Sequence, residues 1–246
     1  MSEPAGERVG LVLVSHSRPL AEGLVALAGQ MAGSVPLHAA GGTDEDGIGT
    51  SFLKVTDAIE QAQQGAGVVV ISDLGSALLI AETVYDTLPE EERERVIVVD
   101  VPFVEGTVAA AVAAEGGADL AAVMQAAEGA RSAWADAPSA GSARHASEPE
   151  LADPSDRADR SRRYLREVIL KNRDGLHARP AAEFVKLANT FPAKVTVNGK
   201  DAKSLLGIMS LGLTAGRTVE IASLDAEGTA AVDALAALVE SGFGEA

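Results

Sequence analysis

Cysteine is absent from this chain of 246 residues, which excludes disulfides, thiolate nucleophiles and cysteine-based metal sites. Aromatic residues are scarce at 3%, while hydrophobic residues make up 47%, so the core must consist mainly of alanine, valine and leucine. No apolar run approaches the roughly 18 residues that span a bilayer, and the N-terminus lacks a signal-peptide pattern. We therefore expect a soluble, cytoplasmic protein.

Positive charge is also in short supply, with 20 lysines and arginines against 36 aspartates and glutamates and a formal net charge of −16. A nucleic-acid partner is disfavoured, because phosphate binding needs a basic face. The acidity is uneven: residues 1–128 hold 5 basic and 20 acidic residues, whereas residues 164–246 hold 9 and 10. Two domains of different electrostatic character are indicated, and the acidic one favours basic protein partners.

Short β-branched runs alternate with longer alanine-rich stretches in the first 128 residues. The predicted strands are 9–14, 35–40, 67–71 and 95–101, and the predicted amphipathic helices are 19–33, 50–65 and 76–89. This alternation predicts an α/β fold with a doubly wound, mainly parallel sheet. Ligands of such a sheet are expected at the carboxyl ends of its strands.

A linker and a second domain are predicted after residue 128. Residues 129–163 are rich in Ala, Ser, Pro, Asp and Arg without a periodic apolar face, which is typical of a flexible linker. From Tyr164 to residue 246 the pattern predicts a βαββαβα open-faced sandwich, in which Asn198-Gly199 is a strong hairpin signal. Its predicted strands are 164–171, 193–198, 200–204 and 218–223, and its predicted helices are 178–191, 205–212 and 228–242.

His177 stands between the first predicted strand and the first predicted helix of the second domain. Pro180 suits the first turn of a helix, where its missing N–H costs nothing. We therefore expect His177 at the helix N-terminus, among backbone donors that include Ala178 and near the positive end of the helix dipole. This position, with the forked guanidinium of Arg179, suits a phosphoryl group on the imidazole. An ordinary surface histidine that caps the helix is the alternative.

The segment GLHARPA, followed by NGKDAKSLLGIMSLG at 198–212, resembles HPr, the phosphocarrier protein of the bacterial phosphoenolpyruvate-dependent phosphotransferase system. The resemblance covers essentially all of residues 164–246. It implies that His177 is phosphorylated and that Arg179 is its charge partner. Ser204 falls where some HPr proteins are regulated by serine phosphorylation, although a hydroxyl at a helix start is more often an N-cap.

His16 follows the first predicted strand directly and precedes a helix. After the third strand comes Asp73, and Gly75 and Ser76 lie in a turn into another helix. Because the functional residues of a parallel sheet lie at the carboxyl ends of its strands, we expect Asp73 and the unpaired backbone N–H groups of the helix start to lie close to His16 there. A carboxylate beside an imidazole fixes its tautomer and supports the cation formed during transfer. The alternative is that Asp73 only caps its helix and that His16 is a satisfied strand-end residue.

The segments LVLVSHSRPLAEGL, GGTDEDGIGTS, DLGSALLIAET and PFVEGTVAAAV together resemble the mannose-type IIA domain of the same system, over roughly residues 8–128. DLGSA and VEGT place the resemblance with the DhaM family, the phosphoryl-donor subunits of phosphoenolpyruvate-dependent dihydroxyacetone kinases, rather than with sugar-transport relatives. The resemblance implies that His16 is a second phosphorylation site and that this domain forms a homodimer. Because the chain stops after the HPr-like part, we expect it to depend on a separate enzyme I.

Together the resemblances imply a phosphohistidine relay with no bound cofactor, a phosphoenolpyruvate–dihydroxyacetone phosphotransferase subunit. The phosphoryl group would pass from phosphoenolpyruvate through enzyme I, or a free HPr, to His177 and then to His16. From His16 it would go to ADP on a DhaL subunit, and the ATP formed there would phosphorylate dihydroxyacetone bound on a DhaK subunit. Two alternatives stay open: a sugar-uptake IIA–HPr fusion that feeds a membrane permease, and a regulatory phosphoprotein without catalytic function.

The two remaining histidines give little indication of a site. His38 ends an apolar strand and is expected to be buried or structural, with a site role as the alternative because it lies at the carboxyl end of a strand. His145 lies in the linker and is expected to be solvated. Neither has metal-ligand spacing with another His, Asp or Glu, so we expect no protein-bound metal. The glycines at 41, 42, 47 and 49 form neither a P-loop nor a dinucleotide-binding pattern.

Overall fold

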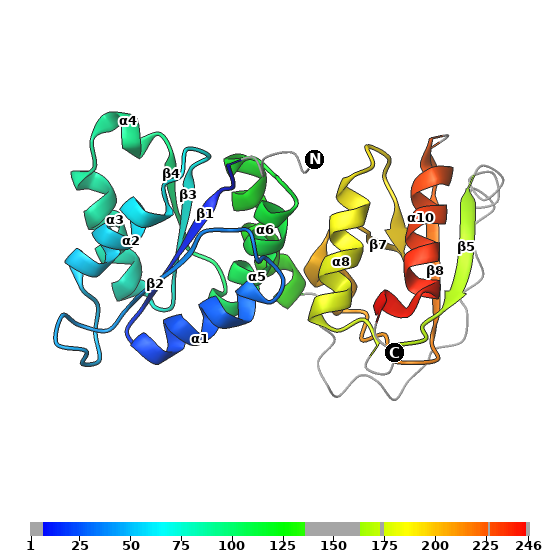
Figure 1. Ribbon diagram of the computed structural model, residues 1–246, viewed down its shortest axis with the longest axis horizontal. Coiled ribbons are helices and arrows are strands. Elements are labelled where there is room, and N and C mark those ends of the chain that lie inside the picture. The colour runs from blue at the N-terminus through cyan, green and yellow to red at the C-terminus, as the bar shows by residue number, and fades with distance from the viewer. Residues whose placement is uncertain (1–6, 136–162, 173–174, 226, 245–246) are drawn as a thin grey trace. The chain divides into compact units, whose positions relative to one another are not determined.

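The computed structural model describes residues 7–135, 163–172, 175–225 and 227–244, and divides the chain into two compact units, Met1–Ser132 and Ala133–Ala246. Figure 1 shows the elements of both units. The last helix of the first unit, α6 (Leu120–Ala135), runs beyond residue 128, where we expected the linker to begin. The remaining linker prediction, residues 136–162, lies outside the described residues.

A four-stranded parallel sheet forms the middle layer of the first unit. Its strands are β1 (Gly10–Ser15), β2 (Leu37–Gly41), β3 (Val68–Ser72) and β4 (Val96–Val99). The order across the sheet is β2-β1-β3-β4, and every neighbouring pair is parallel. All side chains of β1 and β3 are buried, which agrees with their unbroken apolar sequence. The predicted parallel sheet is confirmed.

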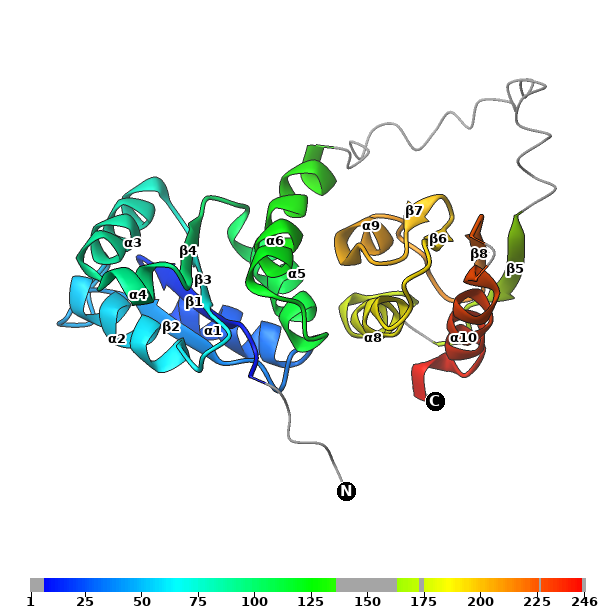
Figure 2. The same ribbon diagram turned by 90° about the horizontal axis from the view of Figure 1, so that it is seen from above.

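Helices cover both faces of this sheet, as Figure 2 shows. Leu11, Leu13 and Ile71 point to the face covered by α1, α5 and α6. Val12, Val14 and Val70 point to the face covered by α2 and α3. The helices are α1 (Arg18–Gly29), α2 (Phe52–Ala62), α3 (Gly75–Thr87), α4 (Glu90–Arg93), α5 (Phe103–Glu115) and α6.

The helix α5 was not predicted from the sequence, and its burial explains why. Eight of its residues, from Gly106 to Ala114, are buried, so it has no polar face that would give an amphipathic period. Its small side chains allow close packing: a Cβ at Gly106 would come 2.5 Å from Cγ2 of Val101.

The second unit has the predicted βαββαβα order. Its strands β5 (Tyr164–Ile169), β6 (Thr196–Val197), β7 (Lys200–Asp201) and β8 (Thr218–Ser223) form an antiparallel sheet in the order β5-β8-β6-β7. Its helices are α8 (Ala178–Asn189), α9 (Leu205–Met209) and α10 (Gly228–Glu240), and a 3-10 turn spans Gly242–Gly244.

The predicted hairpin lies at Asn198-Gly199, where both residues have positive φ, 46° and 80°. This conformation suits the tight turn between β6 and β7, because asparagine and glycine tolerate it best. The two strands are much shorter than predicted: β7 ends at Asp201 rather than at Ser204, which instead begins a helix.

None of the helices in the described parts of the chain is long and apolar enough to cross a membrane.

Candidate functional site

Two neighbouring strands bring His16 and Asp73 together. In the β1–β3 pair Val14 lies opposite Ser72, so the residues that follow the two strands leave the same edge of the sheet side by side. The backbone N–H of Asp73 still donates to the carbonyl of Val14, at 3.1 Å. His16 and Asp73 therefore lie close together at the carboxyl ends of neighbouring strands, as the sequence predicted.

The carboxylate of Asp73 holds the His16 segment at three points. Its Oδ1 lies 2.9 Å from Nδ1 of His16. Its Oδ2 accepts hydrogen bonds from the backbone N–H of His16 at 2.9 Å and from the Ser15 hydroxyl at 2.8 Å. Ser15 Oγ in turn accepts from the N–H of Ser17, at 3.0 Å. The side chain and the backbone of His16 are thus fixed by one carboxylate.

These contacts set the charge of Asp73. Its partial burial by itself raises the pKa, but the hydrogen bonds from the His16 ring, the His16 backbone and the Ser15 hydroxyl together outweigh that effect. The pKa of Asp73 is held below its ordinary value of 3.8. Asp73 is therefore a carboxylate at neutral pH, and the Nδ1 of His16 that faces it must carry a hydrogen.

In this tautomer the other ring nitrogen of His16, Nε2, carries the lone pair and is able to act as a nucleophile. It lies 2.8 Å from the hydroxyl of Ser76, which can donate to it. Ser76 belongs to the first turn of α3, whose N-cap residue Leu74 provides no side-chain cap. A group transferred to Nε2 therefore meets the N-terminal end of α3, including the backbone at Gly75, where the helix dipole favours negative charge.

A loop after β2 also contacts His16, which the sequence alone did not indicate. The N–H of Gly42 donates to the Ser15 carbonyl at 3.0 Å, and the N–H of Gly49 donates to the His16 carbonyl at 2.9 Å. Gly41 must be glycine, because a Cβ there would come 2.6 Å from Cα of Arg18. This loop therefore fixes the backbone on both sides of the His16 peptide.

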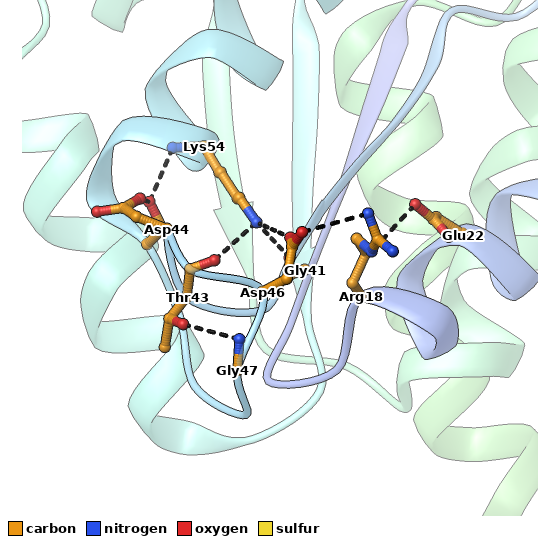
Figure 3. Close-up of polar contacts among 9 residues, drawn as sticks. Arg18, Glu22, Gly41, Thr43, Asp44, Asp46, Gly47 and Lys54 are labelled. Carbon is orange, nitrogen blue, oxygen red and sulfur yellow. Dashed lines mark hydrogen bonds and ion pairs between the residues drawn. The ribbon is translucent and has the colours of Figure 1, made fainter.

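Lys54 holds that loop from α2, as Figure 3 shows. Its Nζ donates to the carbonyl of Thr43 at 2.7 Å and to Oδ1 of Asp46 at 2.9 Å. Asp46 also lies 3.5 Å from the guanidinium of Arg18, the first residue of α1. Lys54 and Arg18 are functional candidates that sequence reasoning missed, because their partners depend on the path of the loop.

His177 is the N-cap residue of α8, the position expected from the sequence, and it is exposed. Its N–H donates to the carbonyl of Gly175, and the N–H of Leu176 donates to the carbonyl of Leu213 at 2.8 Å. Gly175 has φ +70°, and a Cβ would meet the Leu213 carbonyl. Backbone contacts from two segments therefore place His177 at the helix start.

The first turn of α8 is suited to an anion. The helix has no side-chain cap hydrogen bond, and Pro180 contributes no N–H, so the backbone donors nearest to His177 are those of Ala178 and Arg179. The guanidinium of Arg179 is exposed and lies 3.6 Å from the carboxylate of Glu183, one turn along the helix.

Two further residues that the sequence singled out, Ser204 and His38, belong to the described parts of the chain. Ser204 is the exposed N-cap of α9, where its hydroxyl accepts from the N–H of Gly207 at 3.1 Å. His38 does not end its strand as expected, since β2 continues to Gly41. Its half-buried ring has a pKa lowered by desolvation. His145 lies outside the described residues. Within the described residues no cluster of His, Cys, Asp and Glu could hold a metal ion.

Both units match known families. Residues 10–124 match the IIA component family described for fructose in the phosphotransferase system, and residues 165–241 match the family described by the phosphorylation site of its HPr component. The fold, the two histidines and these matches define the class: a phosphotransferase-system protein that joins a IIA-type unit to an HPr-type unit. More particularly, the chain belongs to the DhaM family, and the resemblances found in the sequence are confirmed.

Three relatives illustrate the match. DhaM from Escherichia coli, named as the phosphoryl donor subunit of the PEP-dependent dihydroxyacetone kinase, is 38% identical over 245 residues, which cover 96% of this chain and 51% of the relative. DhaM of a second such kinase in Listeria innocua is 37% identical over 105 residues, covering 42% of this chain and 84% of the relative. Phosphocarrier protein HPr from Vibrio cholerae is 43% identical over 81 residues, covering 31% and 95%. The chain spans about half the length of several curated relatives that it matches.

Proposed function

We propose that the chain is a cytoplasmic phosphohistidine relay protein that donates phosphoryl groups for the phosphorylation of dihydroxyacetone. His177 receives the group from enzyme I, directly or through a free HPr, and passes it to His16. From His16 the group goes to ADP on a DhaL-type subunit, where it regenerates ATP for dihydroxyacetone held on a DhaK-type subunit. The IIA-type unit works as a homodimer in this proposal.

The observation that carries the proposal is the orientation of the His16 ring. Oδ1 of Asp73 lies 2.9 Å from Nδ1 of His16 and keeps the hydrogen on that nitrogen. The lone pair is therefore on Nε2, which faces the start of α3. When phosphorus transfers, the bond to the donor nitrogen of His177 breaks as the bond to Nε2 of His16 forms. The positive charge that develops on the ring is balanced by the Asp73 carboxylate.

The surroundings of Nε2 support the same chemistry. Apart from the bond that His16 itself forms to phosphorus, phosphoryl transfer depends mainly on positioning and charge stabilisation. The uncapped first turn of α3 and the hydroxyl of Ser76 provide donors for the phosphoryl oxygens. In the second step the bond to Nε2 breaks while a terminal oxygen of ADP bonds to phosphorus, and His16 returns to its neutral tautomer.

A reconstitution tests the proposal. The chain is phosphorylated with phosphoenolpyruvate and enzyme I and mixed with DhaK, DhaL, ADP and dihydroxyacetone from a competent set of subunits. We expect dihydroxyacetone phosphate to form, and a His16→Ala chain to yield none while still carrying label on His177. Absence of product with the unaltered chain would remove the assignment of the acceptor. Transfer to a IIB domain instead would identify a sugar-transport protein, and stable phospho-His16 without any acceptor would identify a regulatory one.

A further inference from the structure

The two candidate histidines stand in the same seven-residue pattern, although their units have unrelated folds. His16-Ser17-Arg18-Pro19-Leu20-Ala21-Glu22 and His177-Ala178-Arg179-Pro180-Ala181-Ala182-Glu183 both read His-x-Arg-Pro-x-Ala-Glu. In both, the histidine comes just before a helix, and the arginine lies in its first turn. In both, that arginine pairs with the glutamate one turn later, at 3.8 Å in the first unit and 3.6 Å in the second.

The guanidinium of Arg18 is only loosely held. Its partners are Glu22 at 3.8 Å and Asp46 at 3.5 Å, and its side chain is 53% exposed. Figure 3 shows it between these two carboxylates. Both separations are longer than a charge-assisted hydrogen bond, so each is a weak, solvated ion pair. A phosphoryl dianion, with closely spaced oxygens that match the guanidinium fork, binds arginine more strongly than either carboxylate does.

The backbone of Arg18 is fixed next to His16, while its side chain is able to turn. Gly41 packs against Cα of Arg18, and the N–H of Ser17 donates to Ser15 Oγ. The Cα atoms of His16 and Arg18 are at most about 7.6 Å apart, because only two peptide units separate them. An extended arginine side chain spans such a separation.

Asp46 does not need Arg18 as a partner. Its Oδ1 accepts a hydrogen bond from Lys54 at 2.9 Å, whereas Arg18 faces its other oxygen, Oδ2. The hydrogen bond from Lys54, followed by the charge of Arg18, holds the pKa of Asp46 below its ordinary range. When Arg18 turns away, Lys54 still neutralises Asp46 and still holds the loop after β2.

We propose that Arg18 is a phosphoryl-binding residue of the first unit, which turns from Glu22 and Asp46 to the phosphoryl group on His16. It does in the first unit what Arg179 is expected to do for His177 in the second. This inference rests on the proposed phosphorylation of His16 and adds to it a residue that stabilises the phosphorylated state. Glu22 acts against Arg18 as the competing anion of the unphosphorylated state.

An equilibrium measurement tests this role. The full chain carrying His177→Ala is mixed with purified phospho-HPr, and both phosphoproteins are quantified once the transfer to His16 has reached equilibrium. The equilibrium constant depends only on the free energies of the phosphorylated and unphosphorylated proteins, so any effect of Arg18 on docking cancels. Arg95, which precedes β4 at the opposite edge of the sheet, provides a control arginine of the same unit.

We expect Arg18→Ala to lower the equilibrium constant about tenfold, because a charge-assisted hydrogen bond to the phosphoryl group is lost. Arg18→Lys should lower it about threefold, since the charge stays but the fork is lost. Glu22→Gln should raise it about twofold by removing the competitor. Arg95→Ala should leave it unchanged, and thermal unfolding of each variant shows that the fold is retained.

Two results would overturn the inference while leaving the proposed function standing. One is an equilibrium constant for Arg18→Ala within twofold of the parent value. The other is an equal loss in Arg95→Ala, which would assign the effect to net charge. If the parent chain takes no phosphoryl group from phospho-HPr at His16, the proposed function fails, and the role of Arg18 fails with it.

Discussion

The ring of His16 contacts side chains from other segments, whereas the backbone of His177 is placed by backbone contacts within its own loop and with Leu213. The His16 ring is 22% exposed and contacts Asp73 and Ser76, which lie 57 and 60 residues along the chain. His177 is exposed at the N-cap of α8, and its placement comes from Gly175, Leu213 and the helix start.

This difference suits two positions in a relay. A carboxylate that fixes the tautomer of His16 selects one nitrogen as the acceptor and balances the charge on the phosphorylated ring. In the proposed relay an exposed histidine at a helix N-terminus accepts and releases the group readily, because partner proteins can reach it while the helix start stabilises the anion. In the proposed relay the phosphoryl group therefore enters the protein at the exposed His177 and leaves it from the more enclosed His16.

The largest expected effect tests whether His177 receives the phosphoryl group before His16 does. In a His177→Ala chain with phosphoenolpyruvate and enzyme I but no added HPr, labelling of His16 should fall at least about 100-fold, because the nucleophile that receives the group is gone. The reciprocal His16→Ala chain should keep full labelling of His177. Radiolabel on each histidine, assigned by peptide mapping, measures both. Full labelling of His16 without His177 would show that the internal relay is wrong.

The next effect concerns the carboxylate that faces the His16 ring. Asp73→Asn keeps the size of the side chain but allows the amide to donate to Nδ1, which favours the wrong tautomer of His16. We expect the rate of His16 phosphorylation to fall about 100-fold, and labelling of His177 to stay unchanged. Quenched-flow measurement of both rates checks this, with Asp57→Asn on α2 as a matched control. Equal rates in Asp73→Asn and the control would contradict the proposed role of Asp73.

A smaller effect is expected at the helix that faces Nε2. Ser76→Ala removes a neutral donor while the backbone donors of α3 remain, so His16 phosphorylation should slow about three- to tenfold. Ser204→Ala removes the comparable hydroxyl at the start of α9 and should leave His16 unaffected. The same rate assay compares the two variants. A loss as large as that of Asp73→Asn would mean that Ser76 does more than donate one hydrogen bond.

The smallest effect is on stability as a function of pH. The pKa of Asp73 is lower in the folded protein than its ordinary 3.8, so its charge stabilises the fold above about pH 3.8. That contribution is lost as the pH falls from 3.8 through the lowered pKa of the folded state. The difference in melting temperature between the parent and Asp73→Asn should therefore be constant near neutral pH and shrink in this acidic window. Differential scanning calorimetry of both chains measures it, and a difference that grows on acidification would contradict the direction of the shift.

The sequence predicted two kinds of element correctly: short strands that are buried completely, and helices that are buried on one face. The strands β1 and β3 and the helix α8 have such patterns. It missed α5, because a helix buried on nearly all sides has no amphipathic period, and it gave β6 and β7 too many residues. The length of a strand cannot be predicted from β-propensity alone, because it depends on how far the neighbouring strand pairs with it.

At the candidate sites, the juxtaposition of His16 with Asp73 and Ser76 could be predicted, since neighbouring parallel strands end at one edge. The contacts of Ser15, Gly49 and Lys54 could not. They depend on how the loop after β2 turns back over β1, and no periodic pattern encodes a loop path.

The distribution of partners around His16 has a consequence for folding. Its site needs the ends of β1 and β3 and the loop after β2, so three segments far apart in the sequence must be joined before the ring is oriented. Such non-local pairing forms late, because the entropy of loop closure must be overcome first. If His16 carries the phosphoryl group as proposed, a newly made chain becomes able to carry it only once β1, β2 and β3 are paired, and label at that position would report that these three strands are in place.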